Sequence, residues 1–232
     1  MNILLHLIYD FLKVLVLLVL RIFFRKISFI NRKNLRYTHP CLLVSNHPNT
    51  LLDPLIPSAF ARKKVFFLAN ASLFAGGFAN WFFSTFYCIP VYRPQDKGYK
   101  PGKNNNSFEK AENHLLKGGT LYIAPEGTSY IERRLRPIKT GTARIALQTA
   151  ARDGFQTNLK ILPVGLNYED QTRFWKNILI HVGQPISVNS YEEEFEKDPF
   201  EAVRMLTEAL QEEMGNQLIS IQDVTESRLF RT

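Results

Sequence analysis

The sequence is poor in cysteine and lacks the short motifs that mark several familiar classes of protein. Two cysteines in 232 residues are too few for a disulfide scaffold, and they favour a reducing compartment. No Gly-x-Ser-x-Gly turn follows a predicted strand, which disfavours a serine hydrolase. No pair of His or Cys residues has the spacing of zinc ligands, so we expect no metal. No nucleic-acid-binding motif occurs, so we expect no nucleic-acid partner.

What the chain does have is a typical folded composition and an excess of positive charge. It is 45% hydrophobic and 22% charged, with a formal net charge of +8. Residues 1–36 hold seven Lys or Arg and one acid, and residues 37–189 hold eighteen and nine, whereas residues 190–232 hold four and eleven. The basic body predicts an anionic partner, either a membrane surface or a phosphorylated substrate. The acidic tail is expected to face away from a bilayer.

The N-terminal residues 3–24 are apolar for about the length that spans a bilayer as a helix. His6, Asp10, Lys13 and Arg21 interrupt them, and at about 100° per residue these four fall within a sector of roughly 80°. The pattern favours a helix in the membrane interface, or one that dips into it with its polar stripe facing the protein. A buried core helix and a true spanning helix are the alternatives.

A basic stretch follows this apolar segment and can pair with the headgroups of anionic membrane lipids. Its members are Arg25, Lys26, Arg32 and Lys33. No basic stretch precedes the apolar segment and no small-residue cleavage site follows it, so we expect an anchor and not a cleaved signal peptide. We therefore expect a monotopic or peripheral protein on the cytoplasmic face of a membrane, a single span being possible.

Beyond this segment, predicted strands alternate with predicted helices, which indicates an α/β fold with a largely parallel sheet flanked by helices. We expect residues 1–35 to form an amphipathic, membrane-binding helical segment and residues 36–232 to form one domain with an acidic, helical C-terminal region. The predicted strands are 41–45, 65–68, 86–91, 120–124, 160–166 and 178–182. The predicted helices are 54–61, 107–117, 141–152 and 191–215, the last starting at Pro199.

The sharpest candidate for chemistry is the segment from Asn46 to Pro54, in which His47 directly follows a predicted buried strand. Asp53 stands six positions after the histidine, and because it precedes Pro54 we expect it to cap the following helix. Such a turn can fold the carboxylate back onto the ring, where it would fix the tautomer and leave the other nitrogen to accept a proton. The alternative is a plain helix cap beside a polar loop histidine.

Three further segments place polar residues at or near the ends of predicted strands. In the first, Glu126, Gly127 and Thr128 follow the strand 120–124, where ligand sites of α/β sheets lie. In the second, Arg93 ends the segment Ile-Pro-Val-Tyr-Arg and is a candidate phosphate ligand. The third is a strand in which Pro163 marks an edge or a ligand-facing break.

Taken together, in this order, these four segments resemble the blocks of the phospholipid/glycerol acyltransferase superfamily, of the lysophosphatidate and glycerol-3-phosphate acyltransferase type. The matching residues are His47 and Asp53, Ile89–Arg93, Ala124–Thr128 and Ile161–Val164. The resemblance covers about residues 36–190. Five residues separate the histidine from the aspartate, one more than the usual four, as in a branch that includes some eukaryotic glycerol-3-phosphate and dihydroxyacetone-phosphate acyltransferases.

The resemblance implies a role for each matching residue. His47 would be the general base and Asp53 its orienting partner. Arg93 would contact the acceptor's phosphate, Glu126, Gly127 and Thr128 would bind the acceptor, and Pro163 would shape the acyl-donor side. The family's arginine after the Glu-Gly-Thr block is missing, and Arg133 or Arg134 can replace it. Lys139 lies where the family often has a basic residue.

The implied reaction moves a fatty acyl group from acyl-CoA or acyl-carrier protein to a hydroxyl of lysophosphatidate, a phosphorylated glycerol acceptor, in phospholipid biosynthesis. It needs no cofactor, because the thioester is itself a substrate. Two alternatives stay open. One is the same chemistry on glycerol-3-phosphate or on another lysolipid or aminolipid. The other is a basic lipid-binding protein without catalysis.

Overall fold

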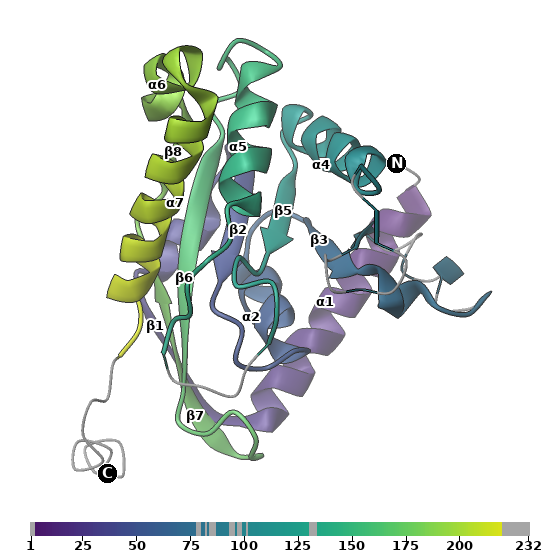
Figure 1. The fold of residues 1–232 in the computed structure, drawn as a ribbon. Helices are drawn as coiled ribbons and strands as arrows, with labels where there is room; N and C mark the ends of the chain where they lie inside the picture. Colours follow the sequence, from purple (N-terminus) through teal and green to yellow (C-terminus); the bar gives the residue numbers. More distant parts are fainter. Residues whose placement is uncertain are drawn as a thin grey trace.

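A computed structural model of the chain describes residues 3–77, 80, 81, 83, 87–92, 96, 99, 100, 102–129 and 134–219. Within these ranges the strands join in one sheet with helices on both of its faces (Figure 1). The strands are β1 (Phe24–Ile30), β2 (Cys41–Ser45), β3 (Val65–Asn70), β4 (Cys88–Val91), β5 (Thr120–Ile123), β6 (Lys160–Tyr168), β7 (Lys176–Val182) and β8 (Ile186–Ser187). The α-helices are α1 (Ile3–Phe23), α2 (Leu52–Phe60), α4 (Asn105–Leu116), α5 (Gly141–Ala151), α6 (Glu192–Lys197) and α7 (Pro199–Asn216). Short 3-10 helices are η1 (Arg32–Arg36), η2 (Ala71–Phe74) and η3 (Val188–Tyr191).

The sheet has the strand order β1-β7-β6-β2-β5-β3-β4, and β8 pairs with the start of β6. Strands β6, β2, β5, β3 and β4 all run parallel. β7 runs antiparallel to β6, and β1 pairs with β7 in parallel. The expected α/β fold with a largely parallel sheet is therefore confirmed, and β2 lies at its centre between β5 and β6.

Two hydrophobic cores lie on the two faces of the sheet. Helices α4, α5 and α7 cover one face, and α1 and α2 cover the other (Figure 1). Successive residues of a strand point to opposite faces, so Leu42 and Val44 enter the first core while Cys41 and Leu43 enter the second. Every residue of β2 is buried, as is typical of a parallel strand covered on both sides.

The expectation of a helical segment over residues 1–35 needs correction at its C-terminal end. α1 stops at Phe23, and the next seven residues form β1, an edge strand of the main sheet that pairs with β7. Phe24 and Leu35 are buried in the core shared by α1 and α2. The apolar residues of β1 directly continue those of α1, and the strand that pairs with β1 is about 150 residues away in sequence. The local periodicity of the sequence therefore does not reveal this strand.

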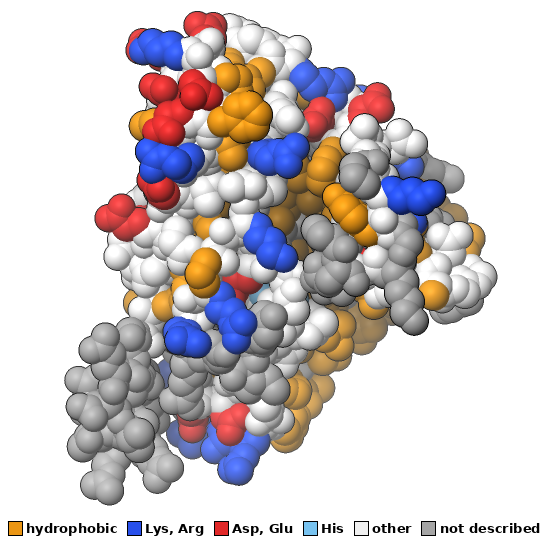
Figure 2. All heavy atoms as spheres, in the orientation of Figure 1, with side chains coloured by type: hydrophobic (Ala, Val, Ile, Leu, Met, Phe, Trp, Pro, Cys, Tyr) orange, Lys and Arg blue, Asp and Glu red, His pale blue; other side chains and the backbone are white. Residues whose placement is uncertain are grey.

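The acidic C-terminal region is helical as expected, but it is divided into η3, α6 and α7. The division lies at Asp198, whose side chain accepts hydrogen bonds from the backbone of Phe200 and Glu201 and so caps α7. The predicted start at Pro199 is confirmed. The acidic side chains gather over α6 and α7 (Figure 2), on the opposite face of the sheet from α1.

Helix α1 turns its polar stripe toward the protein and an apolar face outward. The Lys13 ammonium donates to the carbonyl of Ala61 at 2.5 Å, and Asp10 pairs with Lys64 at 2.9 Å. Large apolar side chains cover the outer face, Phe11 being 67% exposed, and in Figure 2 they line the edge along which α1 runs. The other exposed members are Ile3, Leu4, Leu7, Val14, Leu15, Leu18, Val19 and Ile22.

The packing of α7 against β6 yields a prediction about Gly165. An added Cβ there would lie 2.3 Å from the carbonyl oxygen of Gln217, which is backbone and cannot swing away. We expect Gly165→Ala to lower the free energy of unfolding by about 1–3 kcal/mol in chemical denaturation. The control is Gly215→Ala in α7, where a Cβ meets nothing within 4 Å and a gain of about 0.5–1 kcal/mol is expected. Equal effects of the two changes would contradict this account.

Candidate active site

The candidate site begins where the central strand β2 ends, beside the carboxyl ends of β5 and β6. Ligands of open α/β sheets bind at such strand ends. Asn46 is the first residue after β2, and its side-chain amide makes two hydrogen bonds with the backbone of Leu166 in β6. Its Nδ2 donates to the carbonyl oxygen at 3.1 Å, and its Oδ1 accepts from the amide at 2.7 Å. This pair of bonds fixes the start of the turn that carries His47.

The turn brings Asp53 back onto the ring of His47, which is the first of the two alternatives that the sequence allowed. The Nδ1 of His47 lies 3.0 Å from Oδ2 of Asp53. An ionised carboxylate can only accept, so Nδ1 carries the proton in this pair and Nε2 is left as the basic nitrogen. The Asp53 side chain is fully buried, whereas the His47 side chain is 14% exposed. The histidine therefore stands between a buried carboxylate and the solvent side of the site.

The expected capping role of Asp53 is wrong. α2 begins at Leu52, one residue before the aspartate, and the backbone amides of Leu51 and Leu52 donate to Oδ1 of Asn49 instead. The Asp53 carboxylate accepts from the Asn49 amide at 2.6 Å, so it points back into the turn. The N-cap residue of α2 is Leu51, and the Asn49 side chain supplies the acceptor for the first amides of this region while the aspartate binds the histidine.

A third donor to the aspartate is Tyr168 at the end of β6. Its hydroxyl lies 2.5 Å from Oδ1 of Asp53, so both carboxylate oxygens are bound. Burial raises the pKa of Asp53, and the hydrogen bonds from His47, Tyr168 and Asn49 act against that rise by favouring the ionised form. Burial, together with the neighbouring negative charge of Asp53, also raises the pKa of Tyr168 well above its usual value. The phenol is therefore a permanent donor at physiological pH.

Glu126 binds the backbone of the histidine. Its Oε1 accepts from the amide of His47 at 2.8 Å, and its side chain is buried. Burial raises the pKa of Glu126, while hydrogen bonds from the amides of His47 and Arg136 lower it. The glutamate of the Glu-Gly-Thr block is thus joined directly to the histidine block, a contact that the sequence analysis did not include.

The residues after Glu126 turn tightly, and Lys139 packs across them. Gly127 has φ +72°, and a Cβ on it would lie 2.9 Å from the Nζ of Lys139. The Lys139 amide also donates to the carbonyl of Pro125 at 2.9 Å. The structure therefore brings Lys139 to the Glu-Gly-Thr block, and Thr128 follows there half-buried.

The remaining predicted site residues are placed apart from this cluster or lie outside the described ranges. Arg93 and Arg133 belong to the second group. Pro163 lies inside β6 opposite Val44, and its carbonyl accepts from the amide of Gly183 at 2.8 Å. It occupies the point where β6 changes its neighbour from β8 to β7, so its missing N–H falls between the two pairings. β6 is not an edge strand, because it lies between β2 on one side and β7 and β8 on the other, so the expectation of an edge is wrong. A ligand-facing break at Pro163 and its role on the acyl-donor side stay predictions.

Sequence reasoning did not find three polar residues that build the site, namely Asn46, Asn49 and Tyr168. The two asparagines flank His47 in a turn after a strand, which is a recognisable signal because Asn side chains often bind nearby backbone. Tyr168 carried no such signal, since it lies two residues beyond the predicted end of its strand. Within the described ranges, no group of three or more His, Cys, Asp and Glu side chains is arranged to hold a metal ion.

Comparisons with known proteins agree with this arrangement. The family model named Acyltransferase matches residues 26–167. The protein named glycerol-3-phosphate O-acyltransferase 2 of Saccharomyces cerevisiae is 34% identical over 104 residues, which are 44% of this chain and 14% of that protein. Glycerol-3-phosphate O-acyltransferase 1 of the same yeast is 31% identical over 81 residues, or 35% of this chain and 10% of that protein. The chain thus aligns with a small part of these curated relatives.

A solved structure shares the fold. It is the crystal structure of the 1-acyl-sn-glycerophosphate (LPA) acyltransferase PlsC from Thermotoga maritima, with a TM-score of 0.51 and 20% sequence identity. The match covers 80% of this chain and 72% of that one. At this identity the likeness concerns the architecture, and the α/β layers and the apolar N-terminal helix agree with it.

The hydrogen bond from Tyr168 to Asp53 yields a prediction about pH. Tyr168→Phe removes a donor that favours the ionised carboxylate, so the pKa of Asp53 should rise further. The acid limb of the profile of kcat/KM for acyl transfer should then move to higher pH, because the protonated aspartate no longer stabilises an imidazolium. The control is Tyr122→Phe, which removes an equally buried hydroxyl that bonds to Ser45 at 2.8 Å. Identical profiles for both variants and the parent chain would contradict the assignment.

Proposed function

Because the chain belongs to the Acyltransferase family, as the resemblance of its sequence motifs indicated, we propose that it acylates a hydroxyl of 1-acylglycerol-3-phosphate with an acyl thioester. The donor is acyl-CoA or acyl-carrier protein. The observation that carries the proposal is the His47–Asp53 pair, in which Nδ1 is bound by a buried carboxylate and Nε2 is the basic nitrogen. This is the arrangement that a general base for a hydroxyl needs.

In the proposed reaction, Nε2 of His47 takes the proton of the acceptor hydroxyl while the hydroxyl oxygen attacks the carbonyl carbon of the thioester. Asp53 stabilises the imidazolium that forms. The tetrahedral intermediate collapses with loss of the thiolate, and the imidazolium returns the proton to sulfur. The products are the new ester and a free thiol, and no acyl-enzyme is required. Glu126 supports this step by holding the backbone of His47 at 2.8 Å.

The acceptor's phosphate would be bound by basic residues around the Glu-Gly-Thr block. Lys139 is one candidate, because its ammonium lies against Gly127 in the described structure. Arg93 and Arg133 are the others that the family resemblance implies. A guanidinium suits this task because it can bind two phosphate oxygens at once.

Glycerol-3-phosphate is the second candidate acceptor. The two yeast relatives are named glycerol-3-phosphate O-acyltransferases, and the five-residue spacing between His47 and Asp53 resembles a branch that includes such enzymes. Both acceptors carry the same phosphate and differ in whether one glycerol hydroxyl is already acylated. The same base and the same phosphate contacts would therefore serve either reaction.

A panel of acceptors tests the function. Purified protein, acyl-CoA and one acceptor are mixed with a thiol reagent, and CoA release is followed for lysophosphatidate, glycerol-3-phosphate and an aminolipid. We expect release with a phosphorylated glycerol acceptor and a loss of about 10²–10⁴-fold in His47→Ala. Thermal unfolding of that variant should stay cooperative, because Asp53 keeps its bonds to Asn49 and Tyr168. Unchanged turnover in the variant would rule out His47 as the base.

We further propose that the protein acts at the cytoplasmic face of a membrane through α1. This helix is 21 residues long, and an 18-residue stretch of it has a mean hydropathy of 2.4 with only 6% of its residues buried. The loop between β6 and β7 extends the same surface. There Phe174 packs on Phe23 at the end of α1, with ring centroids 5.6 Å apart, and Trp175 is 55% exposed. Exposed aromatic rings are typical of residues that lie at a membrane–water interface.

Fluorescence quenching tests this membrane contact. The chain has two tryptophans, so Trp81→Phe leaves Trp175 as the reporter. We expect vesicles with brominated acyl chains to quench its emission and to shift it to shorter wavelength, because the ring enters an apolar phase. The control is the triple variant W81F/W175F/F200W, whose reporter stands on α7 across the sheet and should stay unquenched. Quenching of the control but not of Trp175 would reverse the proposed orientation.

A further inference from the structure

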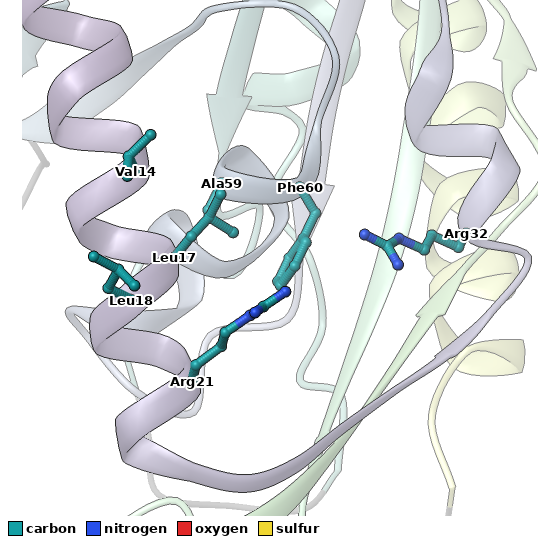
Figure 3. Close-up of a pocket in the computed structure, with 7 residues that line it drawn as sticks. All are labelled: Val14, Leu17, Leu18, Arg21, Arg32, Ala59 and Phe60. Atoms are coloured by element: carbon teal, nitrogen blue, oxygen red, sulfur yellow. The ribbon is translucent and has the colours of Figure 1, made fainter.

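Two adjoining cavities at the C-terminal end of α2 are lined by arginines. One cavity of about 450 Å³ is lined by Arg32, Arg36, Phe60 and Arg62. The second, of about 260 Å³, shares Arg32 and Phe60 with it and opens onto α1 (Figure 3). Its further lining residues are Val14, Leu17, Leu18, Arg21 and Ala59.

The backbone holds these arginines in place although they are far apart in sequence. Asn31, with φ +55°, turns the chain from β1 into η1, which carries Arg32 and Arg36 on successive turns. Leu35 between them is buried, and its carbonyl accepts from the amide of Arg62 at 3.0 Å. The end of α2 is thereby tied to η1, and the three side chains emerge around the same hollow.

The charge of this cluster is not balanced by neighbouring acids. Within the described part of the chain, none of the ion pairs involves Arg21, Arg32, Arg36 or Arg62. The guanidinium of Arg32 stands 4.8 Å from the ring centroid of Phe29 and 5.5 Å from that of Phe60, which restrains its orientation. Arg21 reaches toward Phe60 from the other side (Figure 3). Like charges gathered without a partner are unfavourable until an anion joins them.

The second cavity has an apolar wall beside its arginines, so we expect it to bind an anion that also has an apolar part. Val14 and Leu18 form one wall of the second cavity, and both belong to the exposed apolar face of α1. A helix of this kind lies with its apolar face about 5–10 Å into the boundary between headgroups and acyl chains. Arginines on the flank of that face therefore stand at the level of lipid phosphates.

We propose that the two cavities together bind one anionic phospholipid of the bilayer. Its phosphate lies among Arg32, Arg36 and Arg62, and its first acyl carbons lie over Val14 and Leu18. The site is separate from the catalytic pair, because Phe60 is seven residues along α2 from Asp53, or about 10 Å of helix. The inference depends on the proposed membrane contact of α1 but not on the identity of the acyl acceptor.

Flotation with lipid vesicles tests the site without any turnover, so a failure of the proposed acyl transfer would leave the result readable. The vesicles are phosphatidylcholine alone and phosphatidylcholine mixed with phosphatidylglycerol. The variant R32Q/R36Q/R62Q should bind the anionic vesicles about a hundredfold more weakly, since each basic residue near the surface contributes about 1 kcal/mol. Its binding to neutral vesicles should not change, because α1 is intact.

A charge-matched control variant distinguishes a specific phosphate-binding site from a general electrostatic attraction to the anionic bilayer. The variant K110Q/K117Q/K197Q removes three exposed lysines from α4, α6 and the residue after α4, on the opposite face of the sheet. It should keep its binding to anionic vesicles. An equal loss in both triple variants, or no loss in either, would overturn the proposal.

A second variant, R32K/R36K/R62K, keeps the charge and removes the planar fork that binds two phosphate oxygens. We expect an intermediate loss of binding to the anionic vesicles. Full retention would mean that diffuse charge accounts for the binding, and it would overturn the assignment of a phosphate site. Because all three arginines are exposed, both variants should keep a cooperative thermal unfolding transition.

Discussion

The carboxylate of Asp53 is fully buried, and the surroundings of the turn from His47 to Asp53 follow from that burial. An ionised group away from water is stable only when its lone pairs are bound by donors. Here the donors are Nδ1 of His47, the amide of Asn49 and the hydroxyl of Tyr168. They come from the turn after β2 and from the end of β6, so the carboxylate joins two neighbouring strands. The two hydrogen bonds between Asn46 and Leu166 join the same two segments, two residues before Tyr168.

The turn from His47 to Asp53 is also joined to α1 through the loop between β6 and β7. Asn49, which donates to Asp53, uses its side-chain Nδ2 on the carbonyl of Gln171 at 3.0 Å. A few residues later Phe174 packs on Phe23 of α1, and the amide of Trp175 donates to the Phe23 carbonyl at 2.8 Å. The loop thus makes direct contacts with the turn that bears the proposed base and with the helix proposed to enter the lipid. An acceptor embedded in the bilayer would contact both this turn and α1 at one end of the sheet.

The sequence predicted those parts of the molecule that are encoded locally. The strand before His47 and the turn after it each follow from residues within one short segment, and the α/β fold follows from the alternation of such strand and helix segments along the chain. The capping role of Asp53 was wrong because a carboxylate has two possible partners, and its preference for the ring depends on Tyr168, 115 residues later in the chain. β1 and the contact between Glu126 and the His47 amide were missed for the same reason. Each depends on the pairing of strands that are distant in sequence.

The net charge of +8 is unevenly distributed between the two sides of the sheet. The arginine cluster and the apolar face of α1 lie on one side of the sheet, and the acidic helices α6 and α7 lie on the other. The sheet and its helices separate them by about 20 Å, which exceeds the Debye length of about 8 Å at physiological salt. The acidic side is therefore screened from an anionic bilayer when α1 lies on it, and any rotation that brought α7 toward the lipid would be repelled. The acidic region would thus favour the proposed orientation at little cost to binding, and in that orientation the arginine-lined cavities would face the lipid.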